Sequence, residues 1–188
     1  MNESGVAIGV IAAAQGSSVI RSWVPTNAFE QRGIPVPPPG PDDPVDPALS
    51  LSFNANGMLY NSVLSQVLPF PVSCVLWYQG ESNTRPPEVL FYGEELRAFI
   101  EIWRKVFADP ALPFVVVQIA DFIHIEPEAA DGWKLVQQAQ ATLPSRVNGV
   151  KTVVSADVCE NDMIHPVSKK ELSHRIADAA LELIAQAK

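Results

Sequence analysis

The sequence predicts an α/β fold in three layers, α/β/α, with a mainly parallel sheet at its centre. Four apolar runs of strand length recur along the chain without the polar alternation of half-exposed strands, which predicts a sheet that is buried on both faces. Helical patterns separate these runs and no hairpin signal joins them, which predicts parallel strands. The chain has 188 residues, 47% of them hydrophobic, enough for one domain with a substantial core.

The first half of the chain predicts one strand, two helical segments and a long loop. Residues 6–14 (VAIGVIAAA) are a continuous apolar run that predicts the first strand. Turn residues follow at 15–18, and residues 19–23 (VIRSW) predict a short helix. Residues 34–47 are rich in proline, which removes backbone donors and fixes φ, so they predict an extended loop. Beyond Gly57, apolar side chains recur at helical intervals.

The second half of the chain alternates strands with helices. Strands are predicted at 71–79, 113–121 and 149–157, and helices at 87–107, 127–143 and 167–187. The helix over 87–107 has proline at its start and an apolar face. The last helix is strongly amphipathic, which predicts that one of its faces packs against the core.

Composition and charge argue against several classes of function. The formal net charge is −8, and an acidic surface repels phosphate backbones, so we expect no nucleic-acid partner. No apolar run approaches the ~18 residues of a membrane span, so we expect no membrane partner, and the N-terminus lacks the basic start of a signal peptide. Cys74 and Cys159 lie in or beside apolar runs, so we expect two buried free thiols and no metal cluster.

Polar residues gather at the ends of the predicted strands. The stretch WYQGESN, Trp77 to Asn83, follows one strand, Asp121 ends the next, and Asp157 ends the last. Gly16 lies in the turn after the first predicted strand. Because ligands bind at the carboxyl ends of strands in open α/β sheets, this distribution predicts a site there.

The stretch DMIHP, Asp162 to Pro166, predicts an acid–base pair. A carboxylate three residues before His165 can accept the imidazole Nδ1–H, which leaves the other ring nitrogen as a base. Pro166 disfavours the α conformation at His165 and so favours a loop. The same spacing also fits a plain helix start with an exposed histidine, because D-x-x-H occurs often by chance.

Four residues at the strand ends each have two interpretations. Gly16 is either a plain turn or a backbone N–H donor to a developing oxyanion, which a residue without a side chain lets approach closely. Gln79 and Asn83 either cap the following helix or donate side-chain N–H groups to that oxyanion. Glu81 is either a capping carboxylate or a second acid beside His165.

Together these blocks resemble the sialate O-acetylesterase family of SGNH hydrolases, which is related to the acetylxylan esterases. WYQGESN is the longest and most specific block, and D-x-x-H falls in the family's final block. IGVIAAAQGSSVIRSW resembles the second block, LPFVVVQIADF a later strand and GWKLVQQAQ a later helix. The resemblance covers most of the chain and implies a single SGNH-type, flavodoxin-like domain over residues 1–188.

The resemblance also implies roles for single residues. His165 would act as general base and then general acid, with Asp162 orienting its ring. Gly16 would supply a backbone oxyanion donor, and Gln79 or Asn83 a side-chain donor. The implied reaction is hydrolysis of acetyl esters on sugars such as sialic acid or xylan, through an acetyl-serine intermediate and without a metal or cofactor.

Three further positions can be compared with the family pattern: one of them matches it and two depart from it. Glu81 resembles a glutamate that reaches the catalytic histidine in some relatives. Arg21 stands where an acidic residue is common, and Ser17 replaces a common second glycine. Both departures lie near the turn where substrate contacts are expected.

The family's nucleophile, the serine of a G-Q-S-N-type motif after the first strand, has no counterpart that we find in this chain. Ser17 and Ser82 are weaker candidates, and the block around Ser17 matches the oxyanion segment instead. The resemblance therefore implies an N-terminally incomplete domain whose first strand, normally between the second and third, is missing. Such a gap leaves unpaired backbone groups along two apolar strands. We expect a truncated or processed esterase whose sheet is completed by an N-terminal fragment or a second copy.

Two other functions stay open. A non-catalytic carbohydrate-binding or interaction module would keep the SGNH fold and pocket without the nucleophile. A plain structural α/β domain would use every polar strand end as a cap, and it predicts that His165 and Glu81 lie far apart. Relatives act on extracellular glycans, so the resemblance implies a secreted or periplasmic location.

Overall fold

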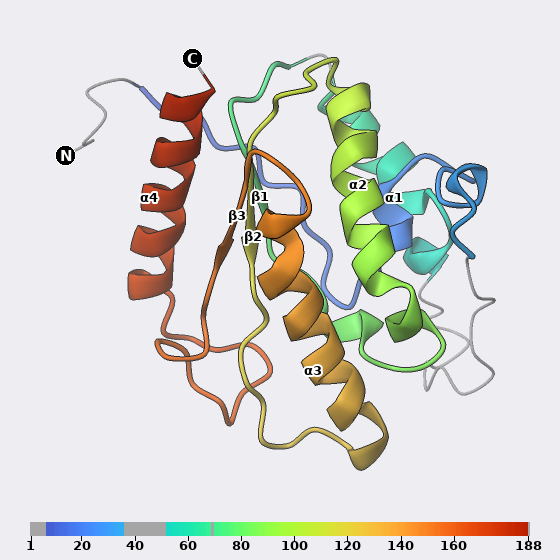
Figure 1. Cartoon of the computed structure of the whole chain (residues 1–188), viewed down its shortest axis with the longest axis vertical. Helices are drawn as coiled ribbons and strands as arrows, with labels where there is room; N and C mark the ends of the chain where they lie inside the picture. Colours follow the sequence, from blue (N-terminus) through green and yellow to red (C-terminus); the bar gives the residue numbers. More distant parts are fainter. Residues whose placement is uncertain (1–6, 36–51, 69, 188) are drawn as a thin grey trace.

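The computed structural model describes residues 7–35, 52–68 and 70–187, and it contains a three-stranded parallel sheet (Figure 1). The strands are β1 (Val75–Trp77), β2 (Phe114–Val117) and β3 (Val150–Val153), in the order β1-β2-β3. Phe114 lies in register with Val75 on one side and Val150 on the other. All four residues of β2 are buried, as a continuous apolar run predicts for a central parallel strand. The parallel sheet is confirmed, with three of the four predicted strands present in shorter form.

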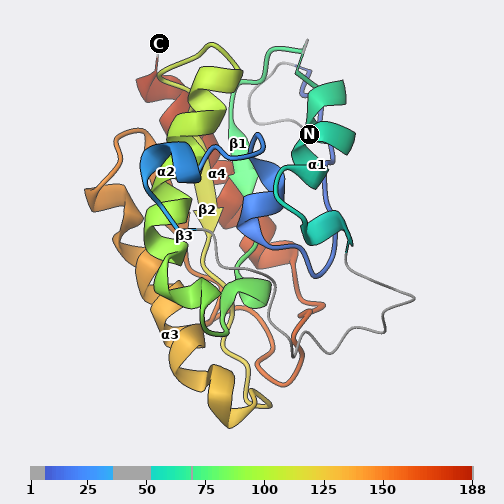
Figure 2. The same ribbon diagram turned by 90° about the vertical axis from the view of Figure 1, so that its right-hand side faces the viewer.

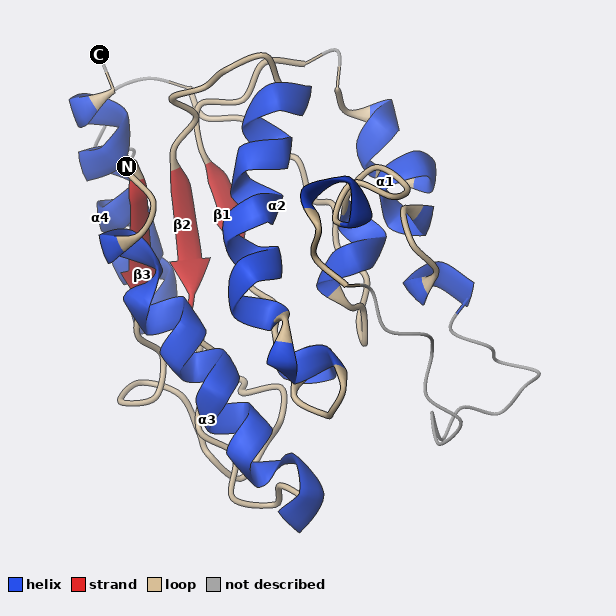
Figure 3. Cartoon of the chain, turned by 45° about the vertical axis from the view of Figure 1, so that its right-hand side comes forward, coloured by secondary structure: helices blue, strands red, loops and turns tan. Residues whose placement is uncertain are grey.

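Helices cover the sheet on both faces and make three layers (Figures 1 and 3). On one side lie α2 (Tyr92–Val106) and α3 (Pro127–Thr142), and on the other lies α4 (Lys170–Gln186). The short helix α1 (Met58–Ser62) lies beyond α2, next to the 3-10 turn Ile20–Trp23 (Figure 2). The predicted α/β class and the predicted helices are confirmed.

Local interactions explain where the helices begin and end. α1 ends at Ser62, whose hydroxyl donates to the Met58 carbonyl at 2.7 Å and so competes with the helical hydrogen bonds. α3 begins at Pro127, where the missing N–H removes no helical hydrogen bond. α2 ends with Arg104 and Lys105 in its last turn, where cations favour the helix dipole.

An aromatic cluster fills the space between the sheet and α2. Trp77 packs against Phe99, with ring centroids 4.3 Å apart, and stands edge-on to Trp23 and Trp103 at 6.1 Å each. Trp103 Nε1 donates to the Trp23 carbonyl at 2.8 Å, which ties the N-terminal 3-10 turn to α2. Such aromatic pairs contribute ~0.5–1.5 kcal/mol each beyond the burial of their area. A smaller core on the opposite face joins the sheet to α4 through Val115, Val117, Val153, Leu172 and Leu183.

The first predicted strand, residues 6–14, is wrong for the part that the structure describes. Residues 7–15 form no strand, and Ile8 and Val10 are 61% and 85% exposed. An apolar run becomes a strand only where the backbone groups of a partner are within reach. In the described chain β1 pairs with β2 alone, and Leu76 of β1 is 56% exposed. The outer edge of β1 therefore has no strand partner among the described residues.

The structure also tests the predictions that the composition gave for the thiols, the proline-rich loop and membrane-spanning segments. Cys74 and Cys159 are free thiols, but they are half-buried rather than buried as predicted. Burial raises the pKa of the Cys74 thiol to about 11, so it stays protonated at neutral pH. Most of the loop predicted at 34–47 lies outside the described residues. Of the helices in the described ranges, none is long and apolar enough to cross a membrane.

Candidate functional site

A buried hydrogen-bond network joins the turn after β1 to the segment that precedes the 3-10 turn Ile20–Trp23. Gln79 Nε2 donates to the Ser18 carbonyl at 2.9 Å and to Asn83 Oδ1 at 2.6 Å. Asn83 Oδ1 also accepts the backbone N–H of Ile20 at 3.1 Å. Buried polar side chains are usually hydrogen-bonded, and here their bonds hold two segments together that are far apart in the sequence.

Two helices support the same turn from behind. Gln140 of α3 is fully buried, and its Nε2 donates to the Gln79 carbonyl at 2.8 Å and to the Tyr92 hydroxyl at 3.2 Å. Its Oε1 accepts the backbone N–H of Ile119 at 2.9 Å. Tyr92 of α2 donates its hydroxyl to the same Gln79 carbonyl at 3.1 Å. The backbone of the turn is therefore held by α2, by α3 and, through Gln140, by the segment after β2.

Gly80 lets α3 approach this turn closely. Its φ is +157°, and a Cβ atom there would lie 2.8 Å from Val136 Cγ1 and 3.0 Å from Gln140 Nε2. A larger residue would push α3 away from the turn. Packing therefore explains the glycine of WYQGESN.

The side-chain amide of Asn83 has N–H groups that are not used in hydrogen bonds to described residues, whereas both N–H groups of the Gln79 side chain are used. Gln79 uses its Nε2 on Ser18 and Asn83, whereas Asn83 Nδ2 donates to no described residue. Gly16 lies exposed in the adjoining turn, with nothing within 4 Å of the position that a Cβ would occupy. Of the predicted oxyanion donors, Gly16 is exposed and Asn83 is buried, whereas Gln79 holds the loop together.

The pKa of the Glu81 carboxyl depends on burial and on neighbouring charges. Burial raises the pKa of the Glu81 carboxyl, and backbone N–H groups together with the positive charges of His165 and Lys169 oppose that rise. A charge acts on a carboxyl in this way when the two groups are near each other.

Asp162 and His165 both lie exposed in the loop between β3 and α4. Within the described chain, neither a hydrogen bond nor an ion pair joins the Asp162 carboxylate to the imidazole. Glu160 holds this loop instead, because it accepts the Ser168 backbone N–H at 3.1 Å and also the Ser168 hydroxyl. The acid–base pairing of Asp162 with His165 stays a prediction.

The two acids at the ends of the later strands have structural partners. The Asp157 carboxylate binds Arg175 of α4 through two hydrogen bonds of 2.8 and 2.9 Å. Asp121 accepts a hydrogen bond from Gln137 Nε2 of α3 at 2.9 Å. Both residues therefore connect a strand end to a helix.

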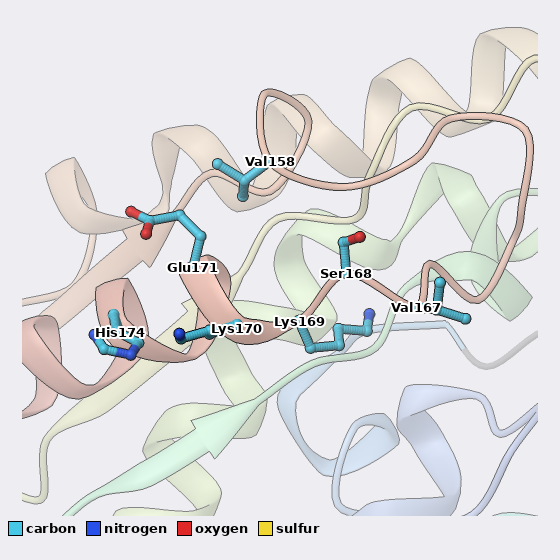
Figure 4. A pocket seen from close by; sticks show the side chains of 7 residues that line it. All are labelled: Val158, Val167, Ser168, Lys169, Lys170, Glu171 and His174. Atoms are coloured by element: carbon cyan, nitrogen blue, oxygen red, sulfur yellow. The ribbon is translucent and has the colours of Figure 1, made fainter.

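An open groove of about 510 Å³ lies at the start of α4, next to the loop that carries His165 (Figure 4). It is lined by Val158, Val167, Ser168, Lys169, Lys170, Glu171 and His174. None of the predicted site residues lines it. Among the described residues no cluster of three or more potential metal ligands occurs.

Comparison with known proteins decides the family. The model of the family described as carbohydrate esterase, sialic acid-specific acetylesterase, matches residues 1–182. The chain belongs to this acetylesterase family. The resemblance predicted from WYQGESN and the D-x-x-H block is therefore confirmed.

Relatives of this chain in the family include longer proteins. The sialate O-acetylesterases of Pongo abelii and Homo sapiens are each 25% identical over 185 residues, which is 90% of this chain and 34% of each relative. The chain thus spans about a third of their length. The crystal structure of a carbohydrate acetylesterase from Xanthomonas citri matches with a TM-score of 0.70 and 28% identity, over 91% of this chain and 35% of that chain. An Arabidopsis thaliana protein, 23% identical with a TM-score of 0.53 over 66% of this chain and 52% of its own, shares the fold.

This member of the family also contains a buried cluster of ionisable side chains that the sequence did not predict. Arg21 is 7% exposed and lies 3.3 Å from the Glu88 carboxylate. Glu95 of α2 is 2% exposed, and its Oε2 has no hydrogen-bond partner among the described residues. Burial raises the pKa of Glu95 to about 8, the charge of Arg21 opposes that rise, and the charge of Glu88 adds to it. The native state therefore holds Glu95 mainly in its neutral form at pH 7.

Between pH 5.5 and 7.5, the free energy of unfolding of the wild type should fall by roughly 2–3 kcal/mol relative to that of Glu95→Gln. The carboxyl has a pKa of about 8 in the folded chain and an ordinary value of 4.5, so the native state binds more protons throughout this range. Its stabilising effect is complete below the ordinary value and is lost as the pH rises through the folded value. Glutamine imitates the neutral acid and removes this loss. Urea unfolding followed by tryptophan fluorescence measures the difference.

Glu94→Gln is the matched control for this prediction. Glu94 is the exposed neighbour of Glu95, and its hydrogen bond to Arg146 lowers its pKa. This control should follow the wild-type pH dependence over the same range. If wild type and Glu95→Gln lose stability in parallel, the neutral state of Glu95 is disproved.

Proposed function

We propose that this chain provides the acid–base and oxyanion-binding part of an enzyme that hydrolyses acetyl esters of sugars. The observation that carries the proposal is the convergence of three segments at the carboxyl end of β1. The turn of Gly16 is tied through Ser18 to Gln79, and the charge of His165 reaches Glu81 in the same turn. Membership of the acetylesterase family supplies the reaction class.

In the proposed reaction a serine hydroxyl attacks the acetyl carbonyl carbon while His165 takes its proton. The N–H groups of Gly16 and Asn83 bind the oxyanion, and loss of one such donor typically costs about 10²–10³ in rate. The bond to the sugar oxygen breaks as His165 returns the proton to it, which leaves acetyl-serine. Water then attacks this ester, and His165 passes the proton of water to the serine oxygen as acetate leaves. Asp162 orients the imidazole and stabilises its charged form.

The serine of this proposal comes from a strand that pairs with the outer edge of β1. That edge has no strand partner among the described residues, and unpaired edges recruit extended chains. Leu76 of β1 is 56% exposed, and such a strand would lie beside it. A parallel strand that ends in a G-Q-S-N turn would place its serine at the same sheet edge as Gln79.

Adding a peptide with the first strand and G-Q-S-N turn of an intact family member should give the chain hydrolytic activity toward 4-nitrophenyl acetate. The peptide supplies both the missing pairing partner and the nucleophile. The same peptide with its serine replaced by alanine should bind equally well, as followed by tryptophan fluorescence, and give no rate above the background. If the serine peptide binds and no hydrolysis follows, the catalytic proposal fails.

A non-catalytic carbohydrate-binding module is the second candidate function. It is favoured by the exposed Asp162 and His165, which make no bond with each other. It predicts binding of O-acetylated sugars without hydrolysis, in the presence or absence of the peptide. Hydrolysis by the chain alone would instead point to Ser17 or Ser82, and alanine variants of these two serines would identify the nucleophile.

A further inference from the structure

Lys169 places its ammonium group over the strand end that carries the proposed site. Its Nζ lies 3.0 Å from the Tyr78 hydroxyl and 4.5 Å from the centroid of the Tyr78 ring. Tyr78 directly follows β1, and the charge of Lys169 reaches Glu81 in the turn beyond it. Figure 4 shows the side chain of Lys169 pointing away from those of Lys170 and His174.

In the described part of the chain, no carboxylate forms an ion pair with Lys169 within 4 Å. Three of the acids near it in the sequence have other partners: Glu160 binds Ser168, and Asp157 and Glu171 pair with Arg175. Helix stability does not explain the lysine either. Lys169 is the N-cap residue of α4, where the positive end of the helix dipole disfavours a cation. An ammonium group that forms no ion pair with any described carboxylate within 4 Å therefore stands beside the site, in a chain whose net charge is −8.

We propose that Lys169 binds the carboxylate of an acidic acetylated sugar and so selects anionic over neutral acetyl esters. This inference rests on the proposed function, and it assigns a residue that sets the charge preference of the site. Tyr78 holds the ammonium through its ring and its hydroxyl, which leaves further N–H donors of Lys169 for a ligand. A carboxylate there would gain a charge-assisted hydrogen bond that a neutral sugar cannot make.

Binding of two matched ligands tests this inference on the full chain supplemented with the alanine form of the strand peptide, which prevents turnover. One ligand is the methyl glycoside of an O-acetylated sialic acid, and the other is the same compound with its carboxylate converted to a methyl ester. The wild type should bind the acid about tenfold more tightly than the ester. Lys169→Met should remove this preference, and Lys169→Arg should keep most of it. Lys170→Met removes the same charge one residue away and should behave as the wild type does.

Each other outcome has a distinct meaning. Equal affinity of the wild type for both ligands overturns the role of Lys169 and leaves the esterase proposal standing. If Lys169→Met weakens the binding of the acid and the binding of the ester by the same factor, Lys169 only positions Tyr78, and the inference is overturned. If the wild type binds neither ligand although the peptide is bound, the proposed function fails, and this inference fails with it.

Discussion

Replacing His165 with alanine should lower the rate of 4-nitrophenyl acetate hydrolysis by the peptide-supplemented chain about 10³–10⁴-fold. The imidazole is the only group in the proposed reaction that both removes the proton of the serine and returns a proton to the leaving oxygen. The oxyanion donors Gly16 and Asn83 stay in place in the variant, so a small residual rate should persist. Initial rates at saturating peptide give the comparison.

His174→Ala is the matched control for this experiment. His174 lies exposed in α4, outside the proposed reaction, and its replacement should leave the rate within about twofold of the wild type. Equal peptide binding by both variants, followed by tryptophan fluorescence, shows that any difference arises in the chemical steps. A His165→Ala variant that keeps most of its activity would remove His165 from the mechanism.

The parts of the fold that local pattern determines could be predicted from the sequence. β2 is buried along its whole length, and its apolar run is uninterrupted. α3 begins at the proline that opens its predicted range. Residues 7–15 show the limit of such reasoning, because their apolar pattern matches that of β2 and yet they form no strand. Whether an apolar run becomes a strand depends on a partner elsewhere, and local pattern carries no information on that partner.

The candidate site also has a part that could be predicted from the sequence and a part that could not. Gln79 and Asn83 could be singled out from residue type and from their place at the end of a strand, whereas the residues that hold them could not. Gln140 lies one helical turn after the buried Val136, and a glutamine on an apolar face signals a buried hydrogen bond. Its partner, the Gln79 carbonyl, is 61 residues away in the sequence, so only the folded chain identifies it.

Substituting Gly132 with alanine should destabilise the chain by about 4 kcal/mol or prevent it from folding. Gly132 is buried in α3, and a Cβ atom there would overlap the carbonyl oxygen of Thr84 and lie 2.8 Å from its carbonyl carbon. Thr84 cannot give way easily, because it is 4% exposed and its hydroxyl donates to the Glu81 carbonyl at 2.8 Å. The added methyl group would therefore push α3 away from the turn that carries Glu81 and Asn83.

Gly93→Ala separates this steric effect from helix propensity. Alanine normally stabilises a helix relative to glycine, by ~0.5–1 kcal/mol. At Gly93 in α2 a Cβ atom would meet nothing closer than Ala139 Cβ at 3.5 Å, an ordinary contact, so this variant should be as stable as the wild type or slightly more stable. Urea unfolding followed by tryptophan fluorescence compares the two variants. Equal stability of Gly132→Ala and Gly93→Ala would mean that α3 does not touch the turn through its backbone, and the support that α3 gives to the site through Gln140 would have to be revised as well.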